Sequence, residues 1–387
     1  MKTVAVIFGG QSTEHDVSVI TALGSVIKPL ELSGDYNVEP VYISKDGSWY
    51  WDKKLNDVSL FSSGDIESFL KKAPKTQLLF DNGLTLVKSS QFAGRKQLQK
   101  IDVVFPAMHG THGEDGELMG ILEMAGVPYV GCGVQASVVS MDKVLTKQVT
   151  EAYGIPSTPW VWLNSEELSN SSASLKKCEG LKYPIFVKPA RLGSSIGITR
   201  VEQKSQLMNA LEVAAHYDDK IIVEQGVSNL IEVTLPIIGN KELLPASLEE
   251  PLLNSEDFFD FDTKYMNGGK KGGKKGGGKL GAQGYSNLPA KLPKDLYKKA
   301  EKLGLDVFKA VGCEGIARID MLIDSKTGQV FFNEINPLPG DLYSHNWRAT
   351  GVSGVELVSR LIKLAEERFT INQKQTTSFD TNFLKQF

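Results

Sequence analysis

Apolar residues fall in short runs separated by glycine turns, a pattern typical of alternating strands and helices. The run from Thr3 to Phe8 is continuously apolar and predicts a buried strand, followed by a turn at Gly9-Gly10. Thr13, with an acidic residue three positions later, predicts the start of the first helix. A second apolar run, 102–107, leads into the glycine-rich segment 109–116, after which apolar residues recur at helical spacing. The repeated order of strand, turn and helix predicts a mixed α/β fold.

Turn-forming residues divide the rest of the chain. A turn predicted at Gly154 to Pro156 and a Ser-rich stretch at 165–174 favour a domain boundary upstream of them, near residue 131. The sequence therefore predicts three parts, over 1–131, 132–226 and 227–387.

The third part contains an insertion of lysines and glycines at 268–284 and closes with a predicted helix from about Gly354 to Arg368. The composition of the insertion cannot bury a core, so we expect a flexible, cationic loop. Two roles stay open for it: a lid whose lysines meet phosphate groups, or a solvated loop without chemistry.

Composition narrows the class of protein. The chain has 387 residues, of which 41% are apolar and 23% charged, and a formal net charge of -3. No apolar run approaches the ~20 residues of a membrane span, and the chain opens on a predicted strand without a signal peptide. Cys132, Cys178 and Cys313 lack the spacing of a metal or disulfide framework. We therefore expect a globular cytoplasmic protein with neither membrane nor nucleic acid as partner.

Two predicted strands, 315–323 and 329–336, flank the five-residue connection 324–328. If they form a hairpin with Ile323 opposite Gln329, alternation places four polar side chains on one face. These side chains are Arg318, Asp320, Glu334 and Asn336. The side-chain oxygen atoms of Asp320, Glu334 and Asn336 are ligands for hard cations such as magnesium, usually beside nucleotide phosphates. The alternative is that the carboxylates only pair with Arg318 on a solvated face.

A lysine-bearing strand precedes a loop of small residues that ends at Gly197. Such a loop presents backbone amides to a phosphate while Lys188 neutralises it from the strand. The missing Gly-Lys-Ser/Thr sequence disfavours a P-loop. Gly9-Gly10 and 131–133 lack the full spacing of a dinucleotide-binding turn.

Seven motifs in order resemble the D-alanine–D-alanine ligases of the ATP-grasp superfamily, over nearly the whole chain. They lie at 8–18, 109–123, 140–143, 188–197, 262–265, 318–320 and 334–340. The resemblance implies an ATP-grasp fold with an N-terminal Rossmann-like parallel-sheet domain. It further implies a homodimer that joins two D-alanines through an acyl phosphate, at the expense of ATP, for peptidoglycan synthesis.

By matching position, the resemblance also assigns nucleotide and metal contacts. Lys143, Lys188 and Ser195 would meet the phosphates, Glu224 with Val227 the adenine, and Glu232 the ribose. Two Mg²⁺ ions, or Mn²⁺, would be held by Asp320, Glu334 and Asn336 and neutralise phosphate oxygens, with Glu334 between them.

The resemblance also assigns a separate set of residues to bind the two amino-acid substrates. Glu14 would take the ammonium of the first D-alanine, with His109 nearby. Arg318 and the Gly340 amide would stabilise the oxyanion of the tetrahedral intermediate. Ser194 and Tyr265 would join Glu14 in a hydrogen-bonded group that draws the lid closed, with Lys264 beside the substrates.

Three departures from the family pattern affect contact surfaces. The lid is longer, one extra residue separates Glu224 from Glu232, and the usual stretch after Gly340 is replaced. The group that meets the carboxylate of the second D-alanine is therefore Ser344, His345 or Asn346. D-Alanine is favoured as second substrate because Tyr265 follows Lys264. D-Lactate, D-serine, an ATP-binding protein without ligase activity and an NAD-dependent oxidoreductase are the alternatives.

Overall fold

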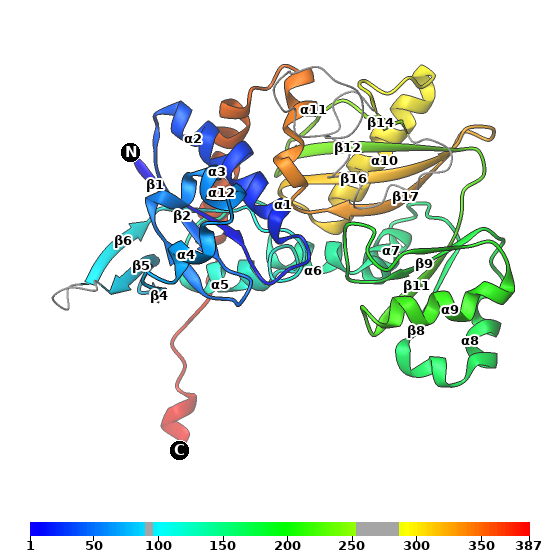
Figure 1. Ribbon diagram of the computed structural model, residues 1–387, viewed down its shortest axis with the longest axis horizontal. Helices are drawn as coiled ribbons and strands as arrows, with labels where there is room; N and C mark the ends of the chain where they lie inside the picture. Colours follow the sequence, from blue (N-terminus) through cyan, green and yellow to red (C-terminus); the bar gives the residue numbers. More distant parts are fainter. Residues whose placement is uncertain (90–95, 253–285) are drawn as a thin grey trace.

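The computed structural model describes residues 1–89, 96–252 and 286–387. Lys264, Tyr265 and the lysine-glycine insertion at 268–284 lie outside the described residues. Four-stranded sheets form the centres of three parts of the chain. The N-terminal part lies on the left in Figure 1, with the C-terminal sheet above the central sheet on the right.

The N-terminal sheet has the order β3-β2-β1-β7 and is parallel except for its edge strand β3. Its strands are β1 (Lys2–Gly9), β2 (Tyr36–Ile43), β3 (Trp49–Trp51) and β7 (Val103–Pro106). A separate antiparallel sheet contains β4 (Thr76–Phe80), β5 (Leu84–Ser89) and β6 (Lys96–Ile101). The helices are α1 (His15–Ile20), the π-helical η1 (Thr21–Ile27), α2 (Lys28–Ser33), η2 (Lys53–Asn56), α3 (Val58–Ser62), α4 (Ile66–Leu70) and α5 (Glu117–Ala125).

The first helix begins one residue later than a cap at Thr13 predicts. Glu14 occupies the position before α1, and its side chain makes no capping hydrogen bond. The Ser12 carbonyl accepts the His15 N–H at 3.2 Å, so the chain completes a turn before the helix starts. The prediction from Thr13 was therefore wrong, and the carboxylate of Glu14 is available for contacts elsewhere.

The central part contains α6 (Val134–Met141), α7 (Lys143–Ala152) and an antiparallel sheet of order β10-β9-β11-β8. Its strands are β8 (Trp160–Asn164), β9 (Ile185–Pro189), β10 (Thr199–Val201) and β11 (Lys220–Gln225). Helices η3 (Ser165–Ser169), α8 (Ser171–Lys177) and α9 (Lys204–Ala215) accompany it. Buried residues of β9, β11 and α9 form one core, which leaves the opposite side of the sheet to carry polar side chains.

The C-terminal part has the antiparallel sheet β13-β12-β16-β17. Its strands are β12 (Leu230–Gly239), β13 (Leu243–Pro245), β16 (Gly315–Asp324) and β17 (Gln329–Asn336), with the short pair β14 (Glu250–Pro251) and β15 (Ser286–Asn287) nearby. The helices are α10 (Lys294–Val311), η5 (Gly340–Tyr343), α11 (Ser344–Ala349), α12 (Gly354–Asn372) and η6 (Phe383–Gln386). Apolar residues of α10 cover the buried face of the sheet.

The β16–β17 hairpin forms as predicted, but its register differs by one residue. Asp324 lies opposite Gln329, and Ile323 lies opposite Val330. In that register alone, Asp320 and Glu334 would point to opposite faces. A β-bulge at Asn333 shifts the pairing, so that Asp320 lies opposite Glu334. The predicted register was wrong, whereas the predicted shared face is correct because the bulge adds one residue.

Helix α12 packs into the N-terminal core. Leu357, Leu361 and Ala365 of α12 belong to the same buried cluster as Val4 and Val6 of β1. Arg368 of α12 donates to the Tyr129 carbonyl at 2.8 Å, and its guanidinium lies 4.4 Å from the centre of the Tyr129 ring. The chain therefore returns at its end to complete the part with which it began.

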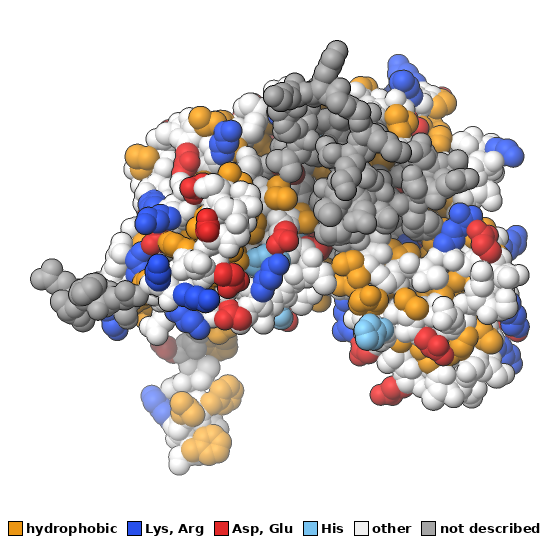
Figure 2. Space-filling view, in the orientation of Figure 1, with side chains coloured by type: hydrophobic (Ala, Val, Ile, Leu, Met, Phe, Trp, Pro, Cys, Tyr) orange, Lys and Arg blue, Asp and Glu red, His pale blue; other side chains and the backbone are white. Residues whose placement is uncertain are grey.

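Beyond α12, a tail ending in η6 protrudes from the body of the molecule and carries apolar side chains (Figure 2). Phe379, Phe383, Leu384 and Phe387 are all exposed. Among the described residues, no helix is both long and apolar enough to cross a bilayer.

Candidate active site

The polar face of the β16–β17 hairpin brings together the four predicted side chains. Arg318 donates from Nε and Nη2 to the two oxygens of Asp320, at 2.8 and 2.6 Å. Asn336 Nδ2 donates to Asp320 Oδ2 at 3.2 Å. Burial opposes the charge of Arg318, yet the Asp320 carboxylate raises its pKa well above the ordinary value. The face thus combines a fixed cation with the oxygen atoms of two carboxylates and one amide.

Two lysines of the central part face this hairpin, as expected. Lys143 begins α7 and donates to the Leu192 carbonyl at 2.7 Å, with its Nζ 3.9 Å from Glu334 Oε2. Burial lowers the pKa of Lys143, which Glu334 partly offsets. Lys188 lies on β9, where burial is outweighed by Glu224, so the pKa of the lysine is raised. Both lysines therefore place positive charge beside the polar face of the hairpin.

Glu224 on β11 is paired with two lysines. Its Oε2 lies 2.5 Å from Lys188 Nζ, and its Oε1 lies 2.6 Å from Lys147 Nζ. Burial would raise the pKa of Glu224, but the two ammonium groups lower it to about 2. Lys147 was missed in the sequence, although it follows Lys143 by four residues and therefore shares its face of α7.

The loop after β9 reaches the N-terminal part through Glu14. Ser194 Oγ donates to Glu14 Oε1, which joins residues that are 180 positions apart. Gly110 and Gly193 make this approach possible, because a Cβ on either would lie 2.8 or 3.0 Å from Glu14 Oε2. Ser194 and Ser195 both adopt positive φ, at 54° and 59°, which turns the loop toward Glu14. The predicted pairing of Glu14 with Ser194 is present.

His109 lies between the N-terminal part and the loop after β17. Its Nε2 is 2.8 Å from Thr21 Oγ1. Burial lowers the pKa of His109 to about 4, so the imidazole is neutral at pH 7. Thr21 Oγ1 also accepts the Asp341 N–H at 2.9 Å. His109 and Thr21 together hold the segment that contains Gly340.

Three consecutive residues after Gly340 adopt left-handed backbone conformations. The φ values of Asp341, Leu342 and Tyr343 are 55°, 49° and 55°. Each costs about 1–2 kcal/mol for a residue with a side chain. Asp341 compensates through hydrogen bonds of its carboxylate with Ser25 Oγ and with Ser344 Oγ, the latter at 2.8 Å. The strained turn therefore fixes the direction of the side chains that follow Gly340.

The same turn determines the position of Tyr343, for which the sequence analysis predicted no role. Its ring lies 5.2 Å from the Arg318 guanidinium carbon, and its hydroxyl is 3.1 Å from Thr234 Oγ1 on β12. The tyrosine ring thus lies within cation–π distance of Arg318. Only the unusual backbone places an aromatic ring there, so alternation along the sequence could not reveal it.

All three candidates for the group that meets the second carboxylate hydrogen-bond other residues of the protein. Ser344 Oγ donates to Asp341, and Asn346 Nδ2 donates to the Ser247 carbonyl at 2.8 Å from a fully buried position. His345 Nε2 lies 2.8 Å from Glu249 Oε2. Burial opposes the charge of Glu249, but the hydrogen bond with His345 lowers its pKa. Glu249 was missed in the sequence.

The remaining predicted contacts lie on neighbouring strands. Glu232 on β12 is near enough to Lys188 to raise the pKa of that lysine. Val227 follows β11 and precedes β12, and Ser195 follows Ser194 in the loop after β9. All three therefore surround the sheet faces that carry the lysines.

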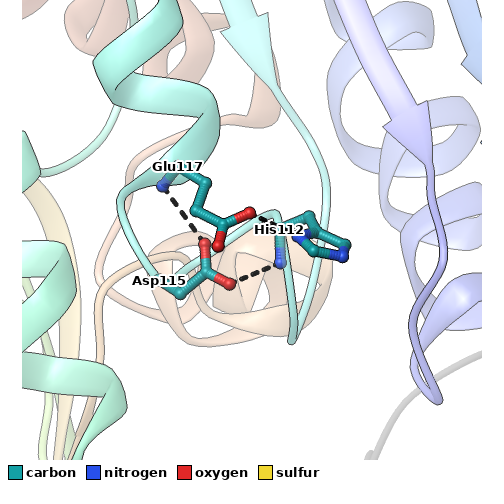
Figure 3. Close-up of side chains that lie close together, drawn as sticks. All are labelled: His112, Asp115 and Glu117. Atoms are coloured by element: carbon teal, nitrogen blue, oxygen red, sulfur yellow. Dashed lines mark hydrogen bonds and ion pairs between the residues drawn. The ribbon is translucent and has the colours of Figure 1, made fainter.

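Beside the site, His112, Asp115 and Glu117 form a cluster at the start of α5, where their side chains face one another (Figure 3). Their potential ligand atoms lie within 4.8 Å of one another. Both oxygens of Asp115 accept backbone N–H groups, from His112 at 2.6 Å and Glu117 at 3.2 Å. The cluster is solvent-facing, and its carboxylates fix the turn that starts the helix.

Comparisons with known proteins agree with this geometry. Residues 3–132 match the family model described as "D-ala D-ala ligase N-terminus", and residues 149–363 match "D-ala D-ala ligase C-terminus". The D-alanine–D-alanine ligase of Acetivibrio thermocellus is 35% identical, over 97% of this chain and 98% of its own length. That of Thermoanaerobacter sp. is 37% identical, over 95% and 97%.

Solved structures show the same relationship. The D-alanine-D-alanine ligase of Coxiella burnetii has a TM-score of 0.77 and 28% identity, with 96% of both chains covered. The VanG D-Ala:D-Ser ligase of Enterococcus faecalis has a TM-score of 0.75 and 30% identity, covering 94% of this chain and 99% of its own. The ATP-grasp fold expected from the sequence is thereby confirmed, and the chain belongs to the D-alanine–D-alanine ligase family.

Proposed function

We propose that the residues around the β16–β17 hairpin catalyse ATP-dependent joining of two D-alanines, the activity of the family, which supplies peptidoglycan precursors. The carboxylate of the first D-alanine takes the γ-phosphoryl group of ATP and becomes an acyl phosphate. The amine of the second D-alanine attacks that carbon, loses a proton, and displaces phosphate. The observation that carries the proposal is that Glu334 and Lys143 face each other, with 3.9 Å between the carboxylate and the ammonium. The β16–β17 hairpin and the loop after β9, to which Lys143 is bonded through the Leu192 carbonyl, therefore border one site.

The nucleotide would lie between the central and C-terminal sheets. Lys143 and Lys188 supply positive charge to its phosphates, with Ser195 in the adjoining loop. Glu224 and Val227 flank the adenine at the end of β11, and Glu232 on β12 holds the ribose. Because Glu224 is charged and already bonded to Lys188 and Lys147, it also fixes Lys188 in an extended position.

The metal donors fit Mg²⁺. Asp320 and Glu334 lie directly opposite each other, and Asn336 adds an amide oxygen on the same face. Two Mg²⁺ ions, or Mn²⁺, held there would neutralise phosphate oxygens of the nucleotide. The protein's own part is to keep these donors facing Lys143, so that the triphosphate is met by positive charge from both sides.

The first D-alanine would bind beside Glu14, whose carboxylate receives the ammonium group. Ser194 holds Glu14 in place, and Tyr265 would complete the hydrogen-bonded group, with Lys264 beside it. His109, neutral at pH 7, would lie near the same ammonium without repelling it. Arg318 and the Gly340 amide would stabilise the oxyanion that forms when the second amine attacks.

The second D-alanine would be bound through His345. Ser344 and Asn346 are engaged in holding the turn, whereas His345, which is paired with Glu249, offers its imidazole ring as a hydrogen-bond donor for a carboxylate. A free-amine nucleophile must be deprotonated before it attacks, so turnover should rise towards alkaline pH. A flat profile would favour a hydroxy acid such as D-lactate.

We further infer that the protein acts in the cytoplasm as a homodimer. ATP is available there, and the three cysteines are all free thiols. The homodimer rests on the family resemblance.

The function is tested by mass spectrometry of the products after D-alanine, D-serine and D-lactate are offered together with ATP and magnesium. We expect D-alanyl-D-alanine as the main product. A mixed product with D-serine, the substrate named for the VanG relative, would refute the assignment of the second substrate. Absence of D-alanine-dependent phosphate release would instead identify an ATP-binding protein without ligase activity.

A further inference from the structure

Asp341 joins the turn after β17 to helix η1 of the N-terminal part. Its carboxylate accepts the Ser25 hydroxyl, and its backbone N–H donates to Thr21 Oγ1 at 2.9 Å. The other carboxylate oxygen accepts the Ser344 hydroxyl at 2.8 Å. Thr21 and Ser25 both belong to η1, and both are buried. Asp341 therefore connects the turn to a fixed helix that lies 316 positions earlier in the sequence.

Apolar contacts hold the same turn against the N-terminal part. Leu338 is 1% exposed and Leu342 is 0% exposed, and both belong to the buried cluster that contains Val26 of η1. Such contacts are non-directional, so they set how deeply the turn lies without setting which way its amides point. The hydrogen bonds of Asp341 depend on angle and supply that second constraint.

The direction of the Gly340 N–H follows from the conformation of Asp341. The Leu342 N–H donates to the Pro339 carbonyl at 2.9 Å, which closes a four-residue turn. Because a trans peptide unit is planar, the Pro339 carbonyl and the Gly340 N–H share one plane and point in opposite directions. Asp341, with φ 55° and ψ 18°, turns the Leu342 N–H back toward Pro339. Holding Asp341 in this conformation thus fixes the direction of the Gly340 N–H.

Tyr343 extends the connection to the arginine of the β16–β17 hairpin. It is the third left-handed residue of the turn, and its ring lies 5.2 Å from the guanidinium carbon of Arg318. The turn therefore contacts one of the two groups assigned to the oxyanion and contains the other, Gly340.

We propose that Asp341 is a positioning residue for the second step of the proposed reaction. In that step the amine nitrogen bonds to the carbonyl carbon of the acyl phosphate, and the carbonyl oxygen takes up negative charge. The charge then returns to the carbon–oxygen bond as phosphate leaves, and the nitrogen loses a proton. Asp341, anchored on η1, keeps the Gly340 N–H directed at the oxygen that becomes charged. The role rests on the proposed function and concerns this step alone, because the preceding phosphoryl transfer uses groups on other elements.

The test separates the two steps in Asp341→Gly. Glycine tolerates positive φ, so the turn keeps its backbone conformation while it loses both carboxylate hydrogen bonds. ATP with an isotope label in the oxygen that bridges its β- and γ-phosphates reports the first step, because reversal of the transfer moves the label to nonbridging positions. Dipeptide formation reports the second step. The ratio of label exchange to dipeptide formation does not depend on the folded fraction, so a loss of stability alone leaves this ratio unchanged.

We expect the ratio to rise at least about 10-fold in Asp341→Gly at saturating D-alanine. Deleting an oxyanion donor costs about 10²–10³ in kcat, and here the donor is misdirected but still present. Asp341→Asn keeps a short side chain that can bond both serines, so it should restore most of the wild-type ratio. Asp57→Gly is the matched control: Asp57 accepts the Ser59 hydroxyl at 2.7 Å at the start of α3, and its loss should leave the ratio at the wild-type value.

Each remaining outcome decides a separate point. Equal ratios in wild type and Asp341→Gly would overturn the role of Asp341. If Asp341→Gly does not fold, Ser25→Ala removes the anchor on η1 alone: a raised ratio then supports the proposal, and an unchanged ratio overturns it. Wild type that shows neither D-alanine-dependent label exchange nor dipeptide refutes the proposed function, and the role of Asp341 with it. Failure of the function is thereby distinguished from failure of the positioning role.

Discussion

Asp320 lies directly opposite Glu334 across the β16–β17 hairpin because Asn333 is the extra residue of a β-bulge. Without that residue the two carboxylates would point to opposite faces of the sheet, one of them into the core formed with α10. The polar face proposed to hold the metal ions thus depends on a single irregularity in an otherwise regular hairpin.

Glu334→Gln should abolish dipeptide synthesis and leave the fold unchanged. The substitution removes a charge from the metal donors and from the partner of Lys143 with little change in shape. We expect a loss of at least about 10³-fold in kcat, since charge neutralisation on the phosphates is a main source of catalysis in phosphoryl transfer. Phosphate release gives the rate, and circular dichroism checks the fold. Turnover near the wild-type rate would show that Glu334 is not a metal ligand.

Lys147→Met should destabilise the protein more than it impairs ATP binding. The lysine is 1% exposed and pairs with Glu224, which keeps Lys188 as its remaining partner. Breaking a buried ion pair costs about 3–5 kcal/mol, and the retained lysine reduces that cost to roughly 1–3 kcal/mol. Urea denaturation measures it. Lys176→Met, a substitution on exposed α8, is the control, and equal stability of the two variants would refute the structural role of Lys147.

His109→Gln should flatten the pH dependence of stability in the acid range. The pKa of buried His109 is lowered to about 4, whereas the unfolded residue titrates near its ordinary value of 6.5. The unfolded state therefore binds the extra proton first, and the free energy of unfolding falls as the pH drops from 6.5 to 4, by at most about 3 kcal/mol. Denaturation of both proteins at pH 7, 5.5 and 4 shows the difference. Parallel curves would mean that His109 is not buried as a neutral ring.

His345→Gln should raise the KM for the second D-alanine by about 10–100-fold and leave the KM for the first within error. The change removes the imidazole ring that would meet the second carboxylate, and a hydrogen bond to a charged group contributes roughly 1.5–3 kcal/mol. Glu249→Gln should act in the same direction, because it replaces the carboxylate that holds the His345 ring in place. Initial rates over a wide range of D-alanine concentration resolve the two sites. An equal rise in both constants would contradict the assignment.

The sequence predicted the hairpin and its polar face because alternation along a strand is a local property. Arg318, Asp320, Glu334 and Asn336 were placed together by counting, even though the bulge lay beyond the reach of the pattern. The contact of Glu14 with Ser194 came only from the family resemblance, because no local rule links residues 180 positions apart.

The unforeseen residues share a physical cause. Lys147 and Glu249 are buried charged residues whose partners lie on other elements, so hydropathy alone gives them no role. Tyr343 depends on a run of left-handed backbone that sequence rules assign to glycine or asparagine. The division of the chain at 131 and 226, and the role of the lysine-glycine insertion, stay predictions.

The packing of α12 against β1 has a consequence for biosynthesis. A ribosome releases the N-terminal part long before it has made residues 354–372, yet those residues supply part of its hydrophobic interior. The nascent chain must therefore keep apolar surface of β1, α2 and β7 uncovered until translation is nearly finished. Truncated translation products would carry that surface permanently, which marks them for chaperones and proteases.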